Sequence, residues 1–163
     1  MAALFASIVF LATLSVWLGG VVFFSFFTAP VIFERLPRNQ AADLIQVIFP
    51  RYYRMGYVCG FAMLVSGCYF LVSSHRPGLV WTSWLLALAA TSVSLYAGMV
   101  VMPRVRRLRL TAASSAGSPE HSVNRALYEK AHHLSVFLNT VVLLLLVVVV
   151  VLFGYQADFF SAD

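Results

Sequence analysis

Polar side chains interrupt the last hydrophobic stretch of the chain, and their spacing points them in one direction. His132, Ser135 and Asn139 follow one another at i, i+3 and i+7, which places them within about one-sixth of a turn on one helix face, with His133 on an adjacent face. Hydrocarbon does not solvate imidazole, hydroxyl or carboxamide groups, so they must face protein, water or a ligand. We therefore predict a polar cavity centred on His132, with His133 and Glu34 as further candidates.

Soft sulfur atoms form a second candidate set. Met55, Cys59 and Met63 are spaced i, i+4 and i+8 along the second hydrophobic stretch, and Met99 and Met102 end the third. Thioether and thiolate sulfur suit a thiophilic ion such as Cu(I), so these five residues are candidate soft-metal ligands. The same residue types also pack well in apolar interiors. Both interpretations are open at this point.

The chain is far more apolar than a soluble protein. It has 163 residues, of which 61% are hydrophobic and 10% charged, with a mean hydropathy of +0.89. An apolar helix of about 20 residues crosses a bilayer. We predict one all-α integral membrane domain over 1–163, a four-helix transmembrane bundle with spans at about 4–33, 52–72, 79–102 and 128–155. Pro30 predicts a tilt or kink near Phe26, because proline removes a backbone donor.

Two polar segments, 34–51 and 103–127, are predicted as cytoplasmic loops. The first has a helical polar stripe beginning at Asn39, so we predict a short helix that lies in the membrane interface and ends before Pro50. The second combines a basic cluster with a small-residue linker, and Ser118-Pro119-Glu120 near its end is a helix-start signal, from which span four would begin as a juxtamembrane helix. Its arginines are candidates for contact with the membrane surface: Arg104, Arg106, Arg107 and Arg109.

Basic residues are distributed unevenly between the two sides of the predicted bundle. Arg76 is alone on one side, and the other ten lie on the opposite side: Arg35, Arg38, Arg51, Arg54, Arg104, Arg106, Arg107, Arg109, Arg125 and Lys130. The positive-inside rule then places both termini on the non-cytoplasmic side. This topological role of the positive charge argues against a nucleic-acid partner. The excess of arginine over lysine favours a bacterial inner membrane.

Three segments carry a family resemblance. They are Leu36-Pro37-Arg38 running to Phe49-Pro50 and Tyr52-Tyr53, then Met102-Pro103-Arg104, and then His132-x-Leu134-Ser135 with Asn139. In this order they resemble the transmembrane protein 205 family, built on a domain of unknown function and similar in layout to copper-resistance protein D-like domains. The resemblance implies a four-helix membrane protein without established enzymatic activity, linked to metal resistance. It singles out His132, Ser135 and Asn139, and implies copper or haem as possible ligands.

Three functions follow from these observations. The first is handling of a soft metal cation or small solute through a cytoplasm-facing polar cavity. The second is an accessory or assembly subunit, or a homo-oligomer, that docks through small-residue faces such as Gly56 and Gly60. The third is a haem or tetrapyrrole protein with His132 or His133 as axial ligand. We do not expect an enzyme, because the sequence has no paired carboxylates within the spans and no nucleophile beside a base in a readable motif.

Overall fold

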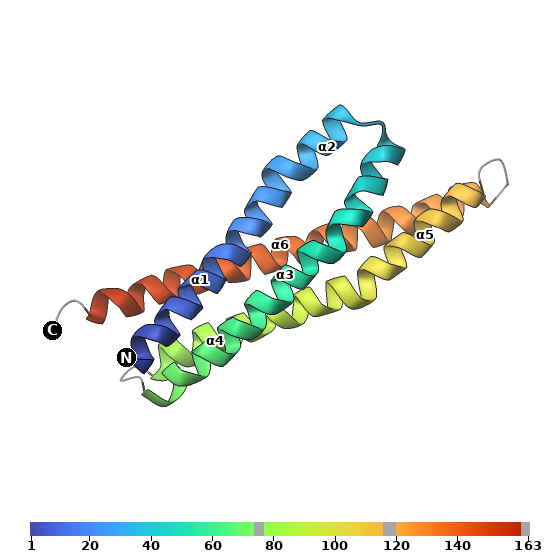
Figure 1. The fold of residues 1–163 in the computed structure, drawn as a ribbon. Coiled ribbons are helices and arrows are strands. Elements are labelled where there is room, and N and C mark those ends of the chain that lie inside the picture. Colours follow the sequence, from blue (N-terminus) through green and yellow to red (C-terminus); the bar gives the residue numbers. More distant parts are fainter. Residues whose placement is uncertain (74–76, 116–119, 161–163) are drawn as a thin grey trace.

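Long helical rods that lie side by side make up the described part of the molecule (Figure 1). The computed structural model describes residues 1–73, 77–115 and 120–160. Within these ranges the elements are helical: α1 (Ala2–Val22), η1 (Phe23–Thr28), α2 (Ala29–Arg35), α3 (Arg38–Ser73), α4 (Pro77–Tyr96), η2 (Ala97–Val101), α5 (Met102–Ser114) and α6 (His121–Phe160). They give four segments long and apolar enough to cross a membrane: Ala2–Arg35, Asn39–Val72, Gly78–Ser114 and His121–Tyr155. The prediction of an all-α membrane protein with four spans is confirmed.

Two of the rods contain a π-helical segment just before a proline. Proline has no N–H, so Pro30 leaves the carbonyl of Phe26 without its helical donor, and Pro103 does the same to Met99. In response the backbone widens. The N–H of Ala29 bonds to the carbonyl of Phe24, and that of Met102 to the carbonyl of Ala97, both five residues back. The irregularity predicted near Phe26 therefore takes the form of the π-helix η1.

The predicted interfacial helix is not a separate element. α3 runs without a break from Arg38 to Ser73, and Pro50 lies inside it. The guanidinium of Arg51 donates to the carbonyl of Val47 at 3.1 Å in the turn that the proline disturbs. The expected break at Phe49-Pro50 is therefore wrong, because a proline can stand inside a membrane helix without ending it.

The second predicted loop, 103–127, is also largely helical. α5 continues the third rod as far as Ser114, and α6 begins at His121, seven residues before the predicted start of its span. Arginine and glutamate are good helix formers, so a helix continues beyond the apolar part of its sequence. The predicted helix cap at Ser118 lies outside the described residues. Hydropathy indicates where the apolar part of each span ends. Helices α5 and α6 extend beyond that point.

The rods pack in the order α1, α3, α4 and α6, with α5 against α6, and a smaller contact between α1 and α6 closes the bundle. α1 contributes four fully buried side chains on one face: Phe10, Leu14, Trp17 and Val21. Glycines on α3 allow close approach, since a Cβ at Gly60 would meet the side chains of Thr91 and Trp17. Small residues bring membrane helices together in this way because packing, more than hydrophobicity, holds them.

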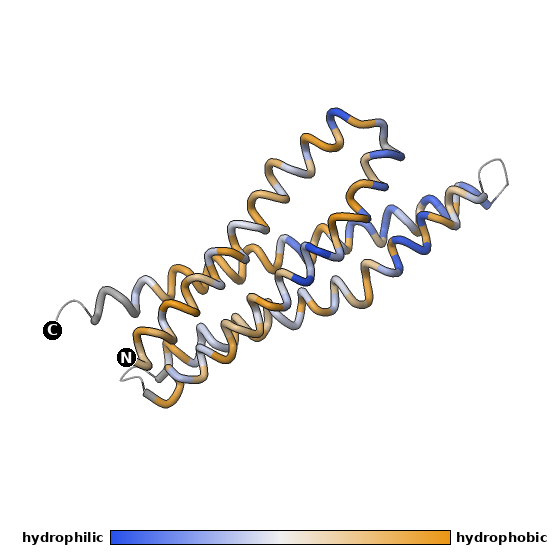
Figure 2. Tube along the Cα trace, in the orientation of Figure 1, coloured by the Kyte–Doolittle hydropathy of each residue, from blue (hydrophilic) through white to orange (hydrophobic). Residues whose placement is uncertain are grey.

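At one end the bundle opens into a fork. α2 and the start of α3 form one arm, and α5 with the start of α6 forms the other (Figure 1). Hydrophilic residues gather on both arms, whereas the remaining length of the rods is mostly hydrophobic (Figure 2). The guanidinium of Arg109 joins the arms. It lies 2.8 Å from the carboxylate of Asp43 and donates to the carbonyl of Asn39 at 2.8 Å.

Candidate functional site

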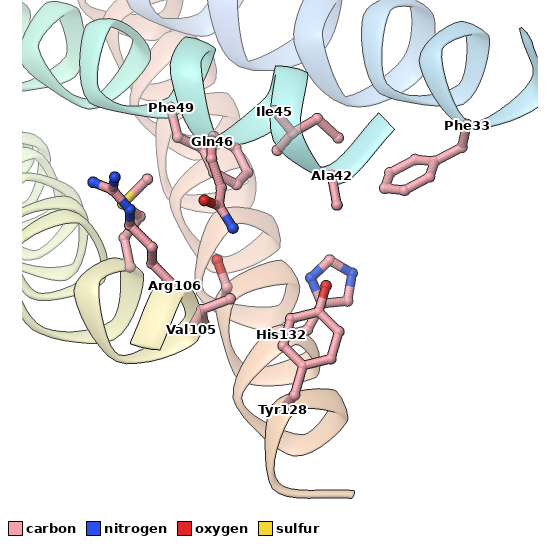
Figure 3. A pocket seen from close by; sticks show the side chains of 11 residues that line it. Phe33, Ala42, Ile45, Gln46, Phe49, Val105, Arg106, Tyr128 and His132 are labelled. Atoms are coloured by element: carbon pink, nitrogen blue, oxygen red, sulfur yellow. The ribbon is translucent and has the colours of Figure 1, made fainter. Parts of the chain in front are cut away.

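A cavity lies between the two arms of the fork, and we refer to it as the fork cavity (Figure 3). It encloses about 40 Å³, enough for about three water molecules by the usual minimum of about 10–15 Å³ each. Four elements line it: α2, α3, α5 and α6. Its polar lining consists of Gln46, Arg106, Tyr128, His132 and Ser135.

α6 supplies the floor of this cavity. Tyr128 and His132, one turn apart, stack with ring centroids 6.1 Å apart, and both rings project toward α3 (Figure 3). Ser135 follows at the next turn and is buried. From the opposite wall the carboxamide of Gln46 points back across the hollow (Figure 3). The stripe predicted from helical spacing therefore faces protein rather than lipid.

Much of the remaining lining is apolar. Phe33 on α2 and three residues of α3, Ala42, Ile45 and Phe49, form one wall. Met102 and Val105 of α5 belong to the other. The cavity thus combines hydrogen-bonding groups with a hydrocarbon surface, as small-molecule sites generally do.

One turn deeper than the cavity, a hydrogen-bonded triad joins three rods. The hydroxyl of Tyr52 on α3 donates to Oδ1 of Asn139 at 2.5 Å, and Nδ2 of Asn139 donates to Oγ of Ser25 at 2.9 Å. Ser25 lies in the π-helix η1, so the widened turn carries one member of the triad. We refer to Ser25, Tyr52 and Asn139 as the polar triad. It satisfies both ends of the Asn139 amide inside the bundle.

Sequence reasoning missed the partners of Asn139. Tyr52 and Ser25 lie 87 and 114 residues away along the chain, so helical spacing cannot associate them with it. The available signal was the Tyr52-Tyr53 pair, which the family resemblance had singled out. Gln46 was assigned to an interfacial helix, and the continuity of α3 is what places it on the cavity wall.

The remaining predicted cavity residues do not reach this site. His133 and Glu34 are both exposed, and neither lines the fork cavity. His133 is one residue from His132, so a rotation of about 100° carries its ring to the outer face of α6. Of the five polar residues proposed from the sequence, His132 and Ser135 line the cavity and Asn139 lies beneath them.

The five sulfur atoms fall in three separate places. Cys59 and Met63 belong to the buried core, and Met55 packs against it beside Gly20. Met99 is 63% exposed, whereas Met102 lines the fork cavity. In the part of the chain that the structure describes, no group of three or more His, Cys, Asp or Glu could hold a metal. The structure therefore does not join the predicted sulfur ligands to His132 as one set.

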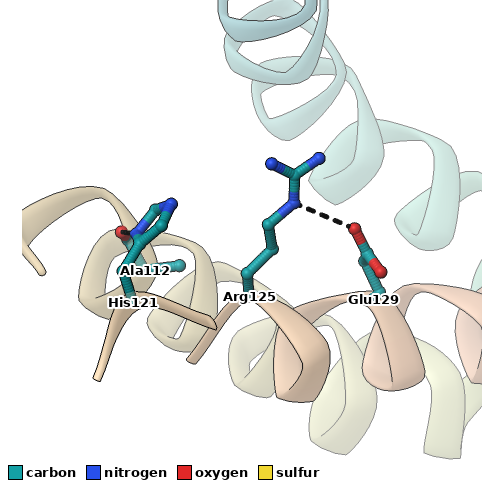
Figure 4. A network of polar contacts seen from close by, with 4 residues as sticks. All are labelled: Ala112, His121, Arg125 and Glu129. Atoms are coloured by element: carbon teal, nitrogen blue, oxygen red, sulfur yellow. Dashed lines mark hydrogen bonds and ion pairs between the residues drawn. The ribbon is translucent and has the colours of Figure 1, made fainter. Parts of the chain in front are cut away.

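The four clustered arginines of α5 also differ in their roles. Arg109 bridges the arms, and the other three are exposed, of which Arg106 alone borders the cavity. Farther along the same arm, His121 Nδ1 lies 3.1 Å from the carbonyl oxygen of Ala112. Arg125 and Glu129 form an i, i+4 ion pair at 3.1 Å (Figure 4). The His121 contact joins α6 to α5, whereas the ion pair lies within α6.

Fold and site together define a small four-span helical membrane protein with a polar cavity at its basic end. The chain belongs to the family described as Domain of unknown function (DUF4149), whose model matches residues 12–114. The matched part covers the first three rods and ends before α6, so it includes the walls of the fork cavity from α2, α3 and α5.

A relative of similar length occurs in Aquifex aeolicus (strain VF5). That protein, described as "Uncharacterized protein", is 30% identical over 133 residues, which cover 82% of this chain and 85% of the relative. No solved structure matches this chain.

Proposed function

We propose that this protein binds a small solute in the fork cavity and handles it at the membrane by binding rather than by catalysis. The observation that carries the proposal is the convergence of Gln46, Arg106 and His132, from three separate helices, on one hollow. Ionisable and amide groups at membrane depth are costly unless they have partners, and they commonly mark ligand sites. The triad beneath gives the site a fixed base.

The lining favours a ligand that accepts hydrogen bonds. Arginine and the amide of glutamine supply donors, tyrosine and serine hydroxyls supply more, and no Asp or Glu is among the described lining residues. A soft cation is the second candidate, because His132 and Met102 both line the cavity. The resemblance to the transmembrane protein 205 family, with its link to metal resistance, points the same way. A tetrapyrrole is larger than the enclosed hollow of about 40 Å³ and would have to extend through its open mouth.

The matched pair His132 and His133 tests the site. Purified protein in mild detergent is screened by thermal unfolding against silver(I), zinc(II), inorganic anions, small organic anions and phospholipids. A true ligand at 100 times its Kd adds about 2.7 kcal/mol, a shift of several °C. We expect His132→Ala to abolish the shift and His133→Ala, on the exposed face, to keep it.

Two results would contradict the proposal. One is the absence of any solute that stabilises the wild type. The other is a stabilising solute whose effect is lost equally in both histidine variants. If stoichiometric partner chains then co-purify with the protein, the role of an assembly subunit takes its place.

We further propose a bacterial inner-membrane location with the fork facing the cytoplasm. The fork is where the predicted cytoplasmic basic residues gather, and its arms are the hydrophilic part of the molecule (Figure 2). An epitope tag after Asp163 should then be digested by protease added to intact spheroplasts. Digestion only after the membrane is permeabilised would reverse the orientation, and with it the side from which the ligand enters.

A further inference from the structure

The charge balance of the fork cavity narrows the class of ligand. Arg106 borders the cavity with an exposed side chain, on the side away from His132 and Tyr128 (Figure 3), and no described lining residue offsets its charge with a carboxylate. Asp43, the acid that pairs across the arms, is already bound by Arg109 at 2.8 Å. Glu34 is exposed and outside the lining. A guanidinium presents several donors in a planar fork that matches phosphate oxygens, and Gln46 and Tyr128 add further donors.

The apolar part of the cavity wall favours an amphiphile over a free inorganic anion as the ligand. Phe33, Ile45 and Phe49 give the arm of α2 and α3 a continuous hydrocarbon face, and Phe33 is 46% exposed at its end. An inorganic anion gains nothing from such a face. An acyl chain can lie along it without leaving apolar surroundings, because lipid tails and these side chains are equally apolar.

The depth of the cavity along the bundle also favours an amphiphile as the ligand. Toward the tips of the arms lie Arg109 and Arg125, and away from them α6 becomes wholly aliphatic from Val141 to Phe153. The cavity therefore lies where the hydrophilic arms join the hydrophobic rods (Figures 2 and 3). This is the depth of phospholipid headgroups, and basic pockets between membrane helices bind such groups.

We propose that the fork cavity binds the phosphate-bearing headgroup of an anionic amphiphile, a membrane phospholipid of the phosphatidylglycerol type. The phosphate lies between Arg106 and the carboxamide of Gln46, and an acyl chain follows Phe33 and Phe49. The enclosed volume holds only the phosphate oxygens, so the rest of the headgroup occupies the open mouth between the arms. This inference rests on the proposed binding function and names its ligand.

Arg106 and Arg107 provide a matched pair for the test. The protein in a neutral maltoside detergent is titrated with phosphatidylglycerol, phosphatidylcholine or inorganic phosphate, and bound lipid is counted by native mass spectrometry. We expect one phosphatidylglycerol bound at least about tenfold more tightly than phosphatidylcholine. Arg106→Gln should weaken it about tenfold, and Arg107→Gln, with the same loss of charge, less than about twofold.

Controls separate the site from surface charge and from misfolding. Arg106→Lys keeps the charge but loses the planar fork, so an intermediate affinity is expected, and unfolding without lipid reports whether each variant is folded. Equal losses in Arg106→Gln and Arg107→Gln would overturn the site. Displacement of the lipid by inorganic phosphate at the same concentration would overturn the amphiphile and leave a free-anion site. A soluble ligand that depends on His132, with no phospholipid effect, would overturn this inference while the proposed function stands.

Discussion

Replacing Gly60 by valine is expected to destabilise the bundle more than any other single change at its α3–α4 contact. A Cβ at this position would lie 2.5 Å from Oγ1 of Thr91 and 3.0 Å from Cζ3 of Trp17. Both neighbours are buried, Trp17 to 2% exposure, so neither can move aside without displacing the core. Overpacking of this kind costs roughly 1–3 kcal/mol, and valine adds two further methyl groups. Equilibrium unfolding in mixed micelles measures the loss.

Gly19 is the matched control. It is also a helical glycine, but a Cβ there meets nothing within 4 Å. Gly19→Val should therefore leave the free energy of unfolding within about 0.5 kcal/mol of the wild type. Thr91→Ala, placed in a Gly60→Ala background, removes the atoms that clash and should recover part of the loss. Equal effects at the two glycines would show that α3 and α4 are not in close contact at Gly60.

Hydropathy predicted the four spans because each contains an apolar window of about 20 residues. Inside a bilayer every backbone N–H and C=O needs a hydrogen-bond partner within the protein, and a helix supplies these partners within one segment. Helix ends were not predictable in the same way. The segment from Arg104 to Arg109 is polar and was predicted as a loop, yet it continues the third rod as part of α5 beyond the hydrocarbon. Pro50 misled because it predicts the end of a helix, whereas α3 continues through it.

The candidate site was predictable only as far as one helix determines it. The 3.6-residue period correctly placed His132 and Ser135 on an inward face of α6, and it also placed Cys59 and Met63 together in the core. Spacing within one helix does not show which of its faces packs against the other helices. The sequence therefore could not indicate that Met99 faces outward. Gln46 and Arg106 come from helices far apart in sequence, and only their packing brings them to His132.

Replacing Asn139 by leucine is the second change with a large expected effect. The substitution preserves approximate volume, removes both hydrogen bonds of the amide, and leaves the hydroxyls of Tyr52 and Ser25 without this partner inside the bundle. Hydrogen bonds between membrane helices average about 0.6 kcal/mol and reach about 1.7, so we expect a loss of roughly 1–3 kcal/mol by unfolding in mixed micelles. Thr140→Val, at an exposed position bonded only to its own helix, is the control.

The sign of this effect decides where Asn139 lies. If its amide faced lipid, leucine would relieve a buried polar group and the protein would become more stable. Inside the triad, leucine must destabilise, and Tyr52→Phe must destabilise less in the Asn139→Leu background than in the wild type, because the shared bond is already gone. Fully additive losses would mean that the two side chains are not bonded. The fork cavity would then lack the fixed base on which the orientation of His132 and Ser135 depends.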